Sequence, residues 1–426
     1  MALAERAGVV VVGASLAGMA AAARLAKAGH RVHLLEATDR LGGGWAPYDV
    51  SGAKVDDAPG VLTFPAPWRD LFRKSGRPLE AELTRSKVAL SPAQAARYVF
   101  DDGSELVLPA ERGGQYYALA EAYGGSVADR WRDLVDHLVD VWQTLRPLGF
   151  EAELRDRRQL SQAKKALRPR QSLADVADEL DEPHLVALVR SVAYRLGSQP
   201  DQTPAWCAAD LAVQRTFGRW CITSDRPGET GRSSVLVEAL AARLALRRVD
   251  VQLGRSVVQI TTDGARATGV TCADGTSLTA AAVICTTDPW QTHSELLGPP
   301  RWRTRRTIRR WQPAHAPSVH HELIPDEVPV VTETVNLSGD GRPRITYVRP
   351  IVSGSVLTTH DYTAGGPSRS AGLAWRGFRS WLDRPPIRSE VAGLFLAGPF
   401  SRAGAGASPV MLSGALASYA CQEYLR

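Results

Sequence analysis

Residues 9–18 have the sequence Val-Val-Val-Val-Gly-Ala-Ser-Leu-Ala-Gly, which places a run of β-branched side chains directly before a glycine turn. Such a run is typical of a strand that is buried on both faces of a parallel sheet. The alanine-rich stretch from Met19 to Ala28 predicts a helix that ends at Gly29, and residues 31–36 predict a second strand. Together these segments predict a complete β-α-β unit of about 30 residues.

The residue types in the turn indicate a binding site for a dinucleotide. Gly13 permits a tight passage from strand to helix, and Gly18 lets the helix pack closely against the strand. Ser15 occupies the middle position of the motif, where the backbone approaches the pyrophosphate and the hydroxyl can donate a hydrogen bond. The helix start at Leu16 and Ala17 is expected to offer free N–H groups and the positive end of the helix dipole to the phosphates.

The segment after the second strand extends this site. Glu36 ends that strand, where a carboxylate accepts hydrogen bonds from a ribose hydroxyl and repels the additional phosphate of NADP. After Ala37, Thr38 and Asp39 the sequence continues as Arg40-Leu41-Gly42-Gly43-Gly44-Trp45. The three glycines keep the backbone open beside a ligand, and Arg40 can reach a phosphate. In this extension the sequence resembles the glutathione-reductase-like flavoproteins, and the resemblance implies FAD as the cofactor.

Two further stretches carry a resemblance to the phytoene desaturase (carotenoid desaturase) family of the amine oxidase superfamily. They are Val55-Asp56-Asp57-Ala58-Pro59-Gly60-Val61-Leu62-Thr63-Phe64-Pro65, and Gly393 to Gly398 with Gly404-Ala405-Gly406 and Pro409-Val410-Met411-Leu412-Ser413-Gly414. The resemblance implies that the glycines and the helix start of the second stretch lie at the flavin, namely Gly398, Gly404, Gly406, Pro409, Val410 and Met411. It also implies that Val257 meets the adenine through its main chain. The chain departs from the family at Ala58-Pro59-Gly60, where a Gly-Pro order is usual, and at Gly231-Arg232-Ser233, where Gly-Gly-Met is usual.

The order of the predicted elements indicates an α/β fold with a discontinuous, Rossmann-like FAD-binding domain. Further strands are expected at 249–253, 257–260, 281–286 and 393–397, and a closing helix at 410–425. We therefore assign residues 1–75, 225–292 and 386–426 to the FAD-binding domain.

The remaining residues, 76–224 and 293–385, are assigned to an inserted α+β substrate-binding domain. Apolar residues at steps of three and four predict helices over 110–145 and 173–192, and polar residues 161–171 are expected as a surface loop or helix end. Alternating apolar and polar residues over 319–359 predict an antiparallel sheet. The family resemblance is weak over 80–190 and 300–385, the stretches expected to shape the substrate pocket.

The resemblance implies a dehydrogenase or desaturase that transfers a hydride from an apolar or secondary-metabolite substrate to the flavin. The alternatives are an amine-oxidase-like enzyme that uses oxygen and a non-catalytic binding protein on the same fold. Candidate bases are Asp56, Asp57, Asp288 and His360, and each also has a structural explanation. Asp56 or Asp57 would support a turn or the flavin, Asp288 would cap a strand end, and His360 would be a hydrogen-bonded polar residue in a sheet.

Composition limits the partners of the chain. The net charge is +6, and the nine histidines and five cysteines lack metal-ligand spacing, so no metal site is expected. The basic and aromatic segment Arg301 to Trp311 can contact an anionic membrane or form a solvated helix, and we expect no nucleic-acid partner. The short apolar runs do not span a membrane, and the unpaired cysteines favour a cytoplasmic location. The expected partner is an apolar small molecule.

Overall fold

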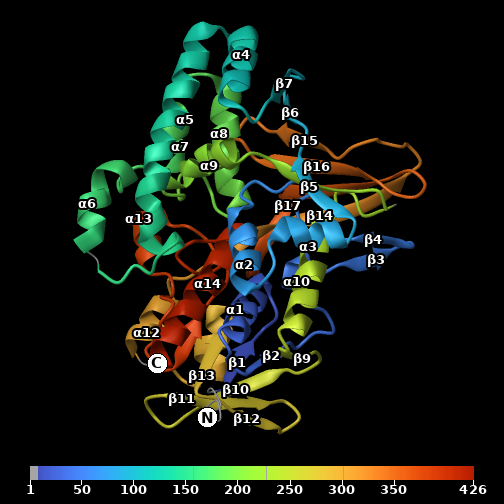
Figure 1. Ribbon diagram of the computed structural model, residues 1–426. Coiled ribbons are helices and arrows are strands. Elements are labelled where there is room, and N and C mark those ends of the chain that lie inside the picture. The colour runs from blue at the N-terminus through green and yellow to red at the C-terminus, as the bar shows by residue number, and fades with distance from the viewer. Residues whose placement is uncertain (1–7, 157, 227, 301) are drawn as a thin grey trace.

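The computed structural model describes residues 8–156, 158–226, 228–300 and 302–426 (Figure 1). Residues 1–7, at the start of the predicted FAD-binding domain, and Arg301, in the predicted basic segment, lie outside the described residues. The lower half of Figure 1 contains a five-stranded, all-parallel sheet in the order β18-β13-β1-β2-β9. Its strands are β1 (Val9–Val12), β2 (Val32–Leu35), β9 (Asp250–Gln252), β13 (Ala282–Cys285) and β18 (Leu394–Leu396).

The alternation of side chains along β1 explains its unbroken β-branched sequence. Val9 and Val11 belong to the apolar cluster on the helical side of the sheet, whereas Val10 and Val12 belong to a second cluster on the opposite side. The helices that contribute to the first cluster include α1 (Leu16–Lys27), α2 (Ala66–Ser75), α10 (Val235–Leu246) and α14 (Ala407–Tyr424). A small antiparallel sheet of β10 (Val257–Thr262), β11 (Ala267–Cys272) and β12 (Ser277–Thr279) contributes to the second.

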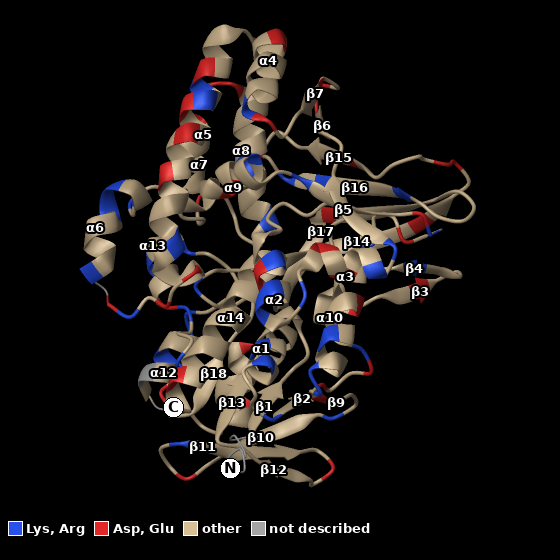
Figure 2. Cartoon of the chain, viewed as in Figure 1, with Lys and Arg blue, Asp and Glu red and all other residues tan. Residues whose placement is uncertain are grey.

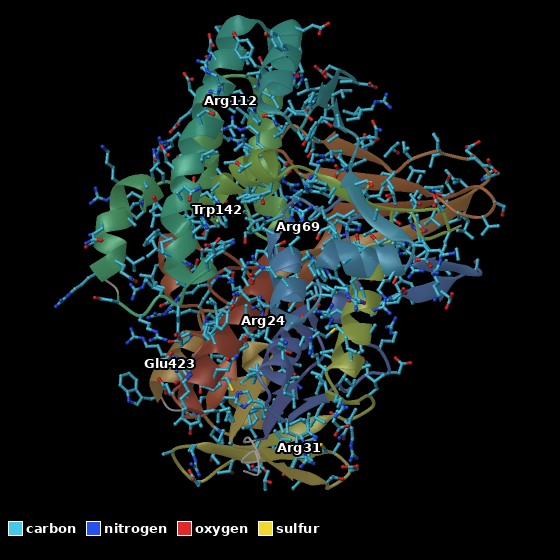
Figure 3. All side chains as sticks on the ribbon, in the orientation of Figure 1. Arg24, Arg31, Arg69, Arg112, Trp142 and Glu423 are labelled. Atoms are coloured by element: carbon cyan, nitrogen blue, oxygen red, sulfur yellow. The ribbon has the colours of Figure 1, made fainter. Side chains whose placement is uncertain are left out.

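A buried arginine joins three of these helices. Arg24 of α1 forms an ion pair with Asp70 of α2 at 2.6 Å and donates a hydrogen bond to the hydroxyl of Tyr419 of α14 at 2.9 Å (Figure 3). Helix α14 approaches α1 closely because position 414 is glycine: a Cβ there would lie 2.3 Å from the carbonyl oxygen of Ala17. The N-terminal and C-terminal segments of the chain are therefore packed into one unit.

The second sheet is six-stranded and mixed, in the order β14-β17-β16-β15-β6-β7. Its strands are β14 (Pro313–Ile324), β17 (Ser355–Leu373), β16 (Pro343–Pro350), β15 (Thr332–Leu337), β6 (Ala96–Phe100) and β7 (Glu105–Leu108). The antiparallel sheet predicted over 319–359 is confirmed, and the chain adds β6 beside β15 as a parallel neighbour. Two further antiparallel pairs are β3 (Tyr48–Val50) with β4 (Ala53–Val55), and β5 (Val88–Pro92) with β8 (Trp220–Ser224).

Helices surround one side of the second sheet, and their boundaries differ from the prediction. The helix expected over 110–145 is two helices, α4 (Arg112–Tyr123) and α5 (Gly125–Leu145), because Gly124 takes a φ of 90°. The helix expected over 173–192 is likewise divided, into α7 (Leu173–Asp178) and α8 (Pro183–Arg195), with Asp181 at a φ of 51° between them. The polar segment 161–171, expected as a surface loop or helix end, contains the end of helix α6 (Arg158–Leu167) and the turn that follows it. The remaining helices are α3 (Leu79–Arg85), α9 (Ala209–Phe217), α11 (Pro289–Gln291), α12 (Trp302–Ile308) and α13 (Gly377–Leu382).

The five parallel strands come from three separate stretches of the chain, and the second sheet comes from the stretches between them. The domain boundaries themselves stay a prediction. Among the residues that the structure describes, none of the helices has the length and apolar character needed to cross a lipid bilayer.

Candidate cofactor and substrate site

The glycine turn between β1 and α1 lies where the strand order of the parallel sheet reverses. β1 lies between β13 and β2, and ligands of such sheets bind at the carboxyl ends of the strands at this switch point. Gly13 has a φ of 91°, and a Cβ there would lie 2.5 Å from the hydroxyl oxygen of Thr286 at the end of β13. A Cβ at Gly18 would lie 2.0 Å from the carbonyl oxygen of Gly13, so both positions require glycine.

The first turn of α1 presents its backbone N–H groups without a capping side chain. Ser15 is the N-cap residue, but its hydroxyl donates to the hydroxyl of Thr286 at 3.2 Å and accepts no hydrogen bond from the N–H groups of the helix, and the first turn contains no acidic residue. The N–H groups of Leu16, Ala17 and Gly18 have no partner inside the helix, because the first turn of any helix lacks one. This helix start is therefore suited to hold a phosphate group.

Glu36 lies beside that turn. One carboxylate oxygen accepts a hydrogen bond from the N–H of Ala14 at 2.7 Å, and the other accepts from the N–H and the hydroxyl of Thr38 at 2.9 Å. The N–H of Arg255, two residues before Val257, donates to the carbonyl oxygen of Glu36 at 2.7 Å. The start of β10 therefore lies next to the end of β2. An adenosine that contacts both Glu36 and Val257 requires this arrangement.

The extension from Arg40 to Trp45 folds back over the glycine turn. The N–H of Gly42 donates to the carbonyl oxygen of Ala14 at 2.9 Å, and a Cβ at Gly42, which has a φ of 105°, would lie 2.7 Å from Val237 of α10. A Cβ at Gly43 would lie 3.6 Å from the Cα and Cβ atoms of Ser15. Trp45 packs against Trp68 of α2, with ring centroids 6.0 Å apart.

Gly44 provides a test of whether this cradle fits FAD. A Cβ at Gly44 would meet no atom within 4 Å, and Gly44 is not among the residues with positive φ. Neither packing nor backbone conformation therefore requires glycine at this position, whereas the close approach of a ligand would require it. The exposed glycines, the uncapped helix start and the carboxylate of Glu36 together fit the ADP half of the cofactor.

The C-terminal glycine segment leads into a second uncapped helix start. Helix α14 begins after Gly406, which has a φ of 101°, and its first turn contains neither a capping side chain nor an acidic residue. Pro409 lies in this first turn, ahead of Val410 and Met411, and the N–H of Gly398 donates to the hydroxyl of Ser413 at 2.9 Å.

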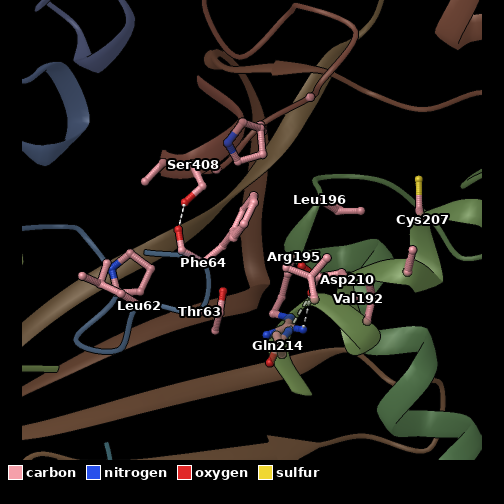
Figure 4. A pocket seen from close by; sticks show the side chains of 18 of the residues that line it. Leu62, Thr63, Phe64, Val192, Arg195, Leu196, Cys207, Asp210, Gln214 and Ser408 are labelled. Atoms are coloured by element: carbon pink, nitrogen blue, oxygen red, sulfur yellow. Dashed lines mark hydrogen bonds and ion pairs between the residues drawn. The ribbon is translucent and has the colours of Figure 1, made fainter. Parts of the chain in front are cut away.

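A cavity of about 270 Å³ lies against this helix start. Its lining includes Trp45, residues 403–409, the segment 59–64, and side chains from α5, α8, α9 and the second sheet (Figure 4). Gly404 borders both the cavity and Trp375, whose ring would lie 3.4 Å from a Cβ at that position. The hydroxyl of Ser408 donates to the carbonyl oxygen of Phe64 at 2.5 Å and ties the 59–64 segment to α14. The cavity is therefore lined by residues from the N-terminal, middle and C-terminal parts of the chain.

The four candidate bases have different surroundings. Asp288 caps α11 by accepting from the N–H of Gln291 at 2.9 Å, as expected of a strand-end cap. Asp56 is buried and accepts from the N–H of Ser234 at 2.9 Å, and burial raises the pKa of its carboxyl group. Asp57 accepts from Tyr48 at 2.6 Å and lies 3.1 Å from a ring nitrogen of His321, whose hydrogen bond lowers the pKa of Asp57.

His360 is the candidate base that lines the cavity. The structure corrects its expected role as a hydrogen-bonded residue, because its Nε2 atom is buried and has no hydrogen-bond partner among the residues that the structure describes. Burial lowers the pKa of His360 from 6.5 to about 4, so the imidazole is neutral at physiological pH. Its ring packs edge-on against Tyr347, with centroids 5.4 Å apart.

Several cavity residues were missed by the sequence analysis. They are the ion-paired and polar residues Arg195, Asp210, Gln214, Arg219 and Glu333. A charged residue on the inward face of an alternating strand, as at position 333, is the signal that could have identified one of them. Among the aromatic residues, Trp206 and Tyr347 line the cavity, whereas Trp290 packs on Trp311 and Trp220 lies under Arg69.

Comparison with known proteins gives a consistent result. The family described as flavin containing amine oxidoreductase matches residues 16–321. A hydroxyneurosporene desaturase of Cereibacter sphaeroides is 28% identical, and the match covers 95% of this chain and 95% of that protein. A lycopene-forming phytoene desaturase of a Paracoccus species is 27% identical over 68% of this chain and 56% of that protein.

Solved structures share the fold at low sequence identity. Putrescine oxidase bound to putrescine superposes over 98% of both chains with a TM-score of 0.68 and 14% identity. An oxidoreductase from Methanosarcina mazei covers 98% of this chain and 100% of its own, with a TM-score of 0.64 and 15% identity. At such identities the agreement concerns the fold alone.

Proposed function

This chain belongs to the family of flavin containing amine oxidoreductases and is an FAD-dependent oxidoreductase, and from this premise we propose that it dehydrogenates an apolar small molecule held in the cavity. The observation that carries the proposal is the position of an aromatic-lined cavity against the start of α14. The desaturase relatives support a carbon–carbon bond as the site of oxidation, because both named relatives are desaturases.

We propose that the ADP half of FAD lies at the glycine turn. Gly13, Ser15 and the first N–H groups of α1 would hold the pyrophosphate, and Glu36 would hold the ribose hydroxyls. Arg40, which is half-exposed beside Tyr48, would approach a phosphate, and Val257 would meet the adenine through its main chain.

The flavin half would lie between Trp45 and the start of α14. Bound FAD supplies a ring that accepts a hydride from the substrate. The uncapped N–H groups of α14 and its dipole would stabilise negative charge at the ring, and the aromatic walls would exclude water.

His360 is our candidate to receive the proton that leaves the adjacent carbon. The other ionisable side chains on the cavity wall that could act as bases, Asp210 and Glu333, are already paired with arginines. The low pKa of His360 makes it a weak base, so hydride departure would have to lead the reaction.

Amine oxidation is not favoured by the cavity lining. None of the described residues that line the cavity is a lysine, the residue that would have favoured an amine-oxidase-like reaction.

The direct test is anaerobic reduction of the purified protein. A yellow preparation with a flavin absorption spectrum should bleach with an apolar dehydrogenation substrate, and it should release no peroxide across a panel of amines in air. A protein that stays colourless after reconstitution with FAD, or that makes peroxide from an amine, would contradict the proposal.

We also propose that helix α12 contacts an anionic membrane surface, from which an apolar substrate could enter. Trp302 is 68% exposed, and Arg305, Arg306, Arg309 and Arg310 are exposed on or just after this helix (Figure 2). A tryptophan beside several arginines suits the interface of an anionic bilayer.

The test is co-sedimentation with phosphatidylglycerol vesicles, with phosphatidylcholine vesicles as the comparison. Trp302→Ala should weaken binding to the anionic vesicles. Tyr117→Ala, at an exposed aromatic residue of α4 that is 75% accessible, should leave it unchanged. Equal binding to the two lipids would contradict a membrane contact of this kind.

A further inference from the structure

One end of the cavity is polar, whereas most of the remaining wall is aliphatic or aromatic. Arg219 forms a buried ion pair with Glu333, and their side chains are 8% and 6% exposed. Arg195 lies 3.2 Å from a carboxylate oxygen of Asp210, which also accepts a hydrogen bond from the amide of Gln214 at 2.6 Å (Figure 4). Each arginine of this polar end is paired with one carboxylate, so the group carries no net charge.

The second sheet adds two tyrosine hydroxyls to the same end. Tyr347 pairs with Glu333 across neighbouring strands, and His360 and Tyr362 are alternate residues of β17, so these side chains share the inward face. Tyr347 is 6% exposed, and burial raises its pKa well above the usual value, while burial raises the pKa of Tyr362 to about 12. Neither hydroxyl has a hydrogen-bond partner among the residues that the structure describes, although both tyrosines line the cavity.

A pure hydrocarbon would leave these groups without partners. When a ligand displaces water from a buried hydroxyl and offers no hydrogen bond, each unpaired group costs about 1–3 kcal/mol. An oxygen atom on the ligand would instead accept a hydrogen bond from Tyr347 or Tyr362. A charged group is unsuitable, because both arginines and both carboxylates are already compensated and a further buried charge would remain unpaired.

The aromatic side chains of the wall suit an apolar body. Phe64, Trp142 and Phe150 pack edge to face, and Trp206 contacts Trp375 in the same way at 5.1 Å. All five rings line the cavity. The cavity volume of about 270 Å³ lies just under the range of about 300–1,000 Å³ found for pockets of drug-sized ligands. Part of this space, between Trp45 and the start of α14, is the place proposed for the flavin, so the remaining volume favours a compact molecule over a long polyene.

We infer that the substrate is a compact apolar molecule with one uncharged oxygen group, a hydroxyl or a carbonyl, which binds at Tyr347 and Tyr362 beside the Arg219–Glu333 pair. This inference rests on the proposed function for the reaction, and it narrows the substrate class. The polar end selects the oxygen group and the aromatic wall holds the hydrocarbon body.

The inference is tested with four isoprenoid probes that differ in their end group: farnesol, farnesene, farnesoic acid and farnesylamine. Binding to the FAD-loaded protein is measured by quenching of tryptophan fluorescence, since Trp142, Trp206 and Trp375 line the cavity. Farnesol should bind at least tenfold more tightly than farnesene, and neither charged probe should exceed farnesol. Farnesene binding within threefold of farnesol, or tighter binding of the acid or the amine, would overturn the inference.

Substitution of the two tyrosines tests whether their hydroxyls are responsible for the preference for farnesol over farnesene. Tyr347→Phe/Tyr362→Phe removes both hydroxyls and keeps the rings, so it should bring farnesol binding down to the level of farnesene. Tyr194→Phe is the matched control, because its hydroxyl donates to Asp340 at 3.3 Å outside the cavity. A double variant that keeps the preference for farnesol would refute the assignment.

A second pair of variants addresses the ion pair without leaving an unpaired charge. Arg219→Leu/Glu333→Leu should increase farnesene binding, whereas Arg97→Leu/Glu105→Leu, which removes an exposed ion pair of the same sheet, should not. Unchanged farnesene binding in the first double variant would count against a selecting role of the pair. Visible absorption of the bound flavin is recorded in parallel for the wild type and each variant. A variant that has lost FAD is thereby distinguished from one that has lost selectivity, whereas a wild type that binds no FAD would refute the proposed function.

Discussion

Replacement of His360 by phenylalanine should change how the stability of the protein depends on pH. The imidazole is 4% exposed, and burial lowers its pKa from 6.5 in the unfolded chain to about 4 in the folded protein. Between these two values the unfolded chain binds a proton that the folded protein excludes, so the free energy of unfolding of the wild type falls as the pH falls. Above pH 6.5 both states are neutral and this effect disappears.

The magnitude follows from the difference between the two pKa values. At about 1.4 kcal/mol per pKa unit, the full effect is roughly 3 kcal/mol, and most of it, roughly 2–3 kcal/mol, is already present at pH 4.5. The nearby groups Asp57, His321 and Glu333 remain in the variant, so the difference between the two proteins isolates His360. Phenylalanine also keeps an aromatic ring against Tyr347 and removes the unpaired ring nitrogen.

The assay is urea denaturation of wild type and His360→Phe at several pH values from 7.5 to 4.5, with equal FAD loading. The free energy of unfolding of the variant should exceed that of the wild type by an amount that grows by roughly 2–3 kcal/mol over this range. His320→Phe is the control, because His320 is an exposed neighbour of the same sheet and should show no such growth. Parallel pH profiles of wild type and His360→Phe would refute a buried, neutral imidazole at this position.

Substitutions at four further positions separate a role in cofactor binding from roles in folding. Gly44→Ala should leave the free energy of unfolding of the apoprotein unchanged or raised by about 0.4–1 kcal/mol but weaken FAD binding at least tenfold in a fluorescence titration, and equal FAD affinity would contradict a cofactor contact. Gly18→Ala, by contrast, should lower stability by at least about 1–3 kcal/mol in thermal denaturation, because its Cβ meets backbone. Arg384→Met should destabilise by about 2–4 kcal/mol in urea, since the guanidinium donates to the carbonyl oxygens of residues 373, 399 and 401, and a loss under 1 kcal/mol would be inconsistent with this role. Asp56→Asn should retain most of the stability that Asp56→Ala loses, about 2 kcal/mol by the same assay, because the amide oxygen can still accept from the N–H of Ser234.

The parallel sheet could be predicted because its signal is local. Each strand is a short apolar run, and the contrast between the two faces of β1 arises from side chains that alternate within four residues. The glycine turn was predictable for the same reason, since Gly13 and Gly18 belong to one short segment. A Cβ at Gly18 would meet the carbonyl oxygen of Gly13. The cofactor roles of these residues stay predictions, and Gly44→Ala is the variant that tests them most directly.

The helix boundaries and the substrate cavity depend on contacts that the sequence does not display. Gly124 interrupts an apolar periodicity that continues through it, so periodicity alone could not divide α4 from α5. Arg219 and Glu333 are 114 positions apart, and their pairing exists only because β15 lies beside the end of α9 in the folded chain. Tertiary contact, rather than local propensity, determines this part of the site.

The depressed basicity of His360 and the balanced charges at the polar end have the same physical origin. Both occur because the cavity removes side chains from water, and a group in such a place stays ionised only when it has an ion-pair partner. Arg219 and Glu333 have partners and His360 has none, so the pairs stay charged while the imidazole is neutral. The same rule applies to a substrate. A ligand that enters this cavity loses its water as well, and the wall offers it hydrogen-bond donors but no uncompensated charge. An uncharged oxygen group on an apolar body is therefore the chemistry that the cavity can hold without leaving a buried group unpaired.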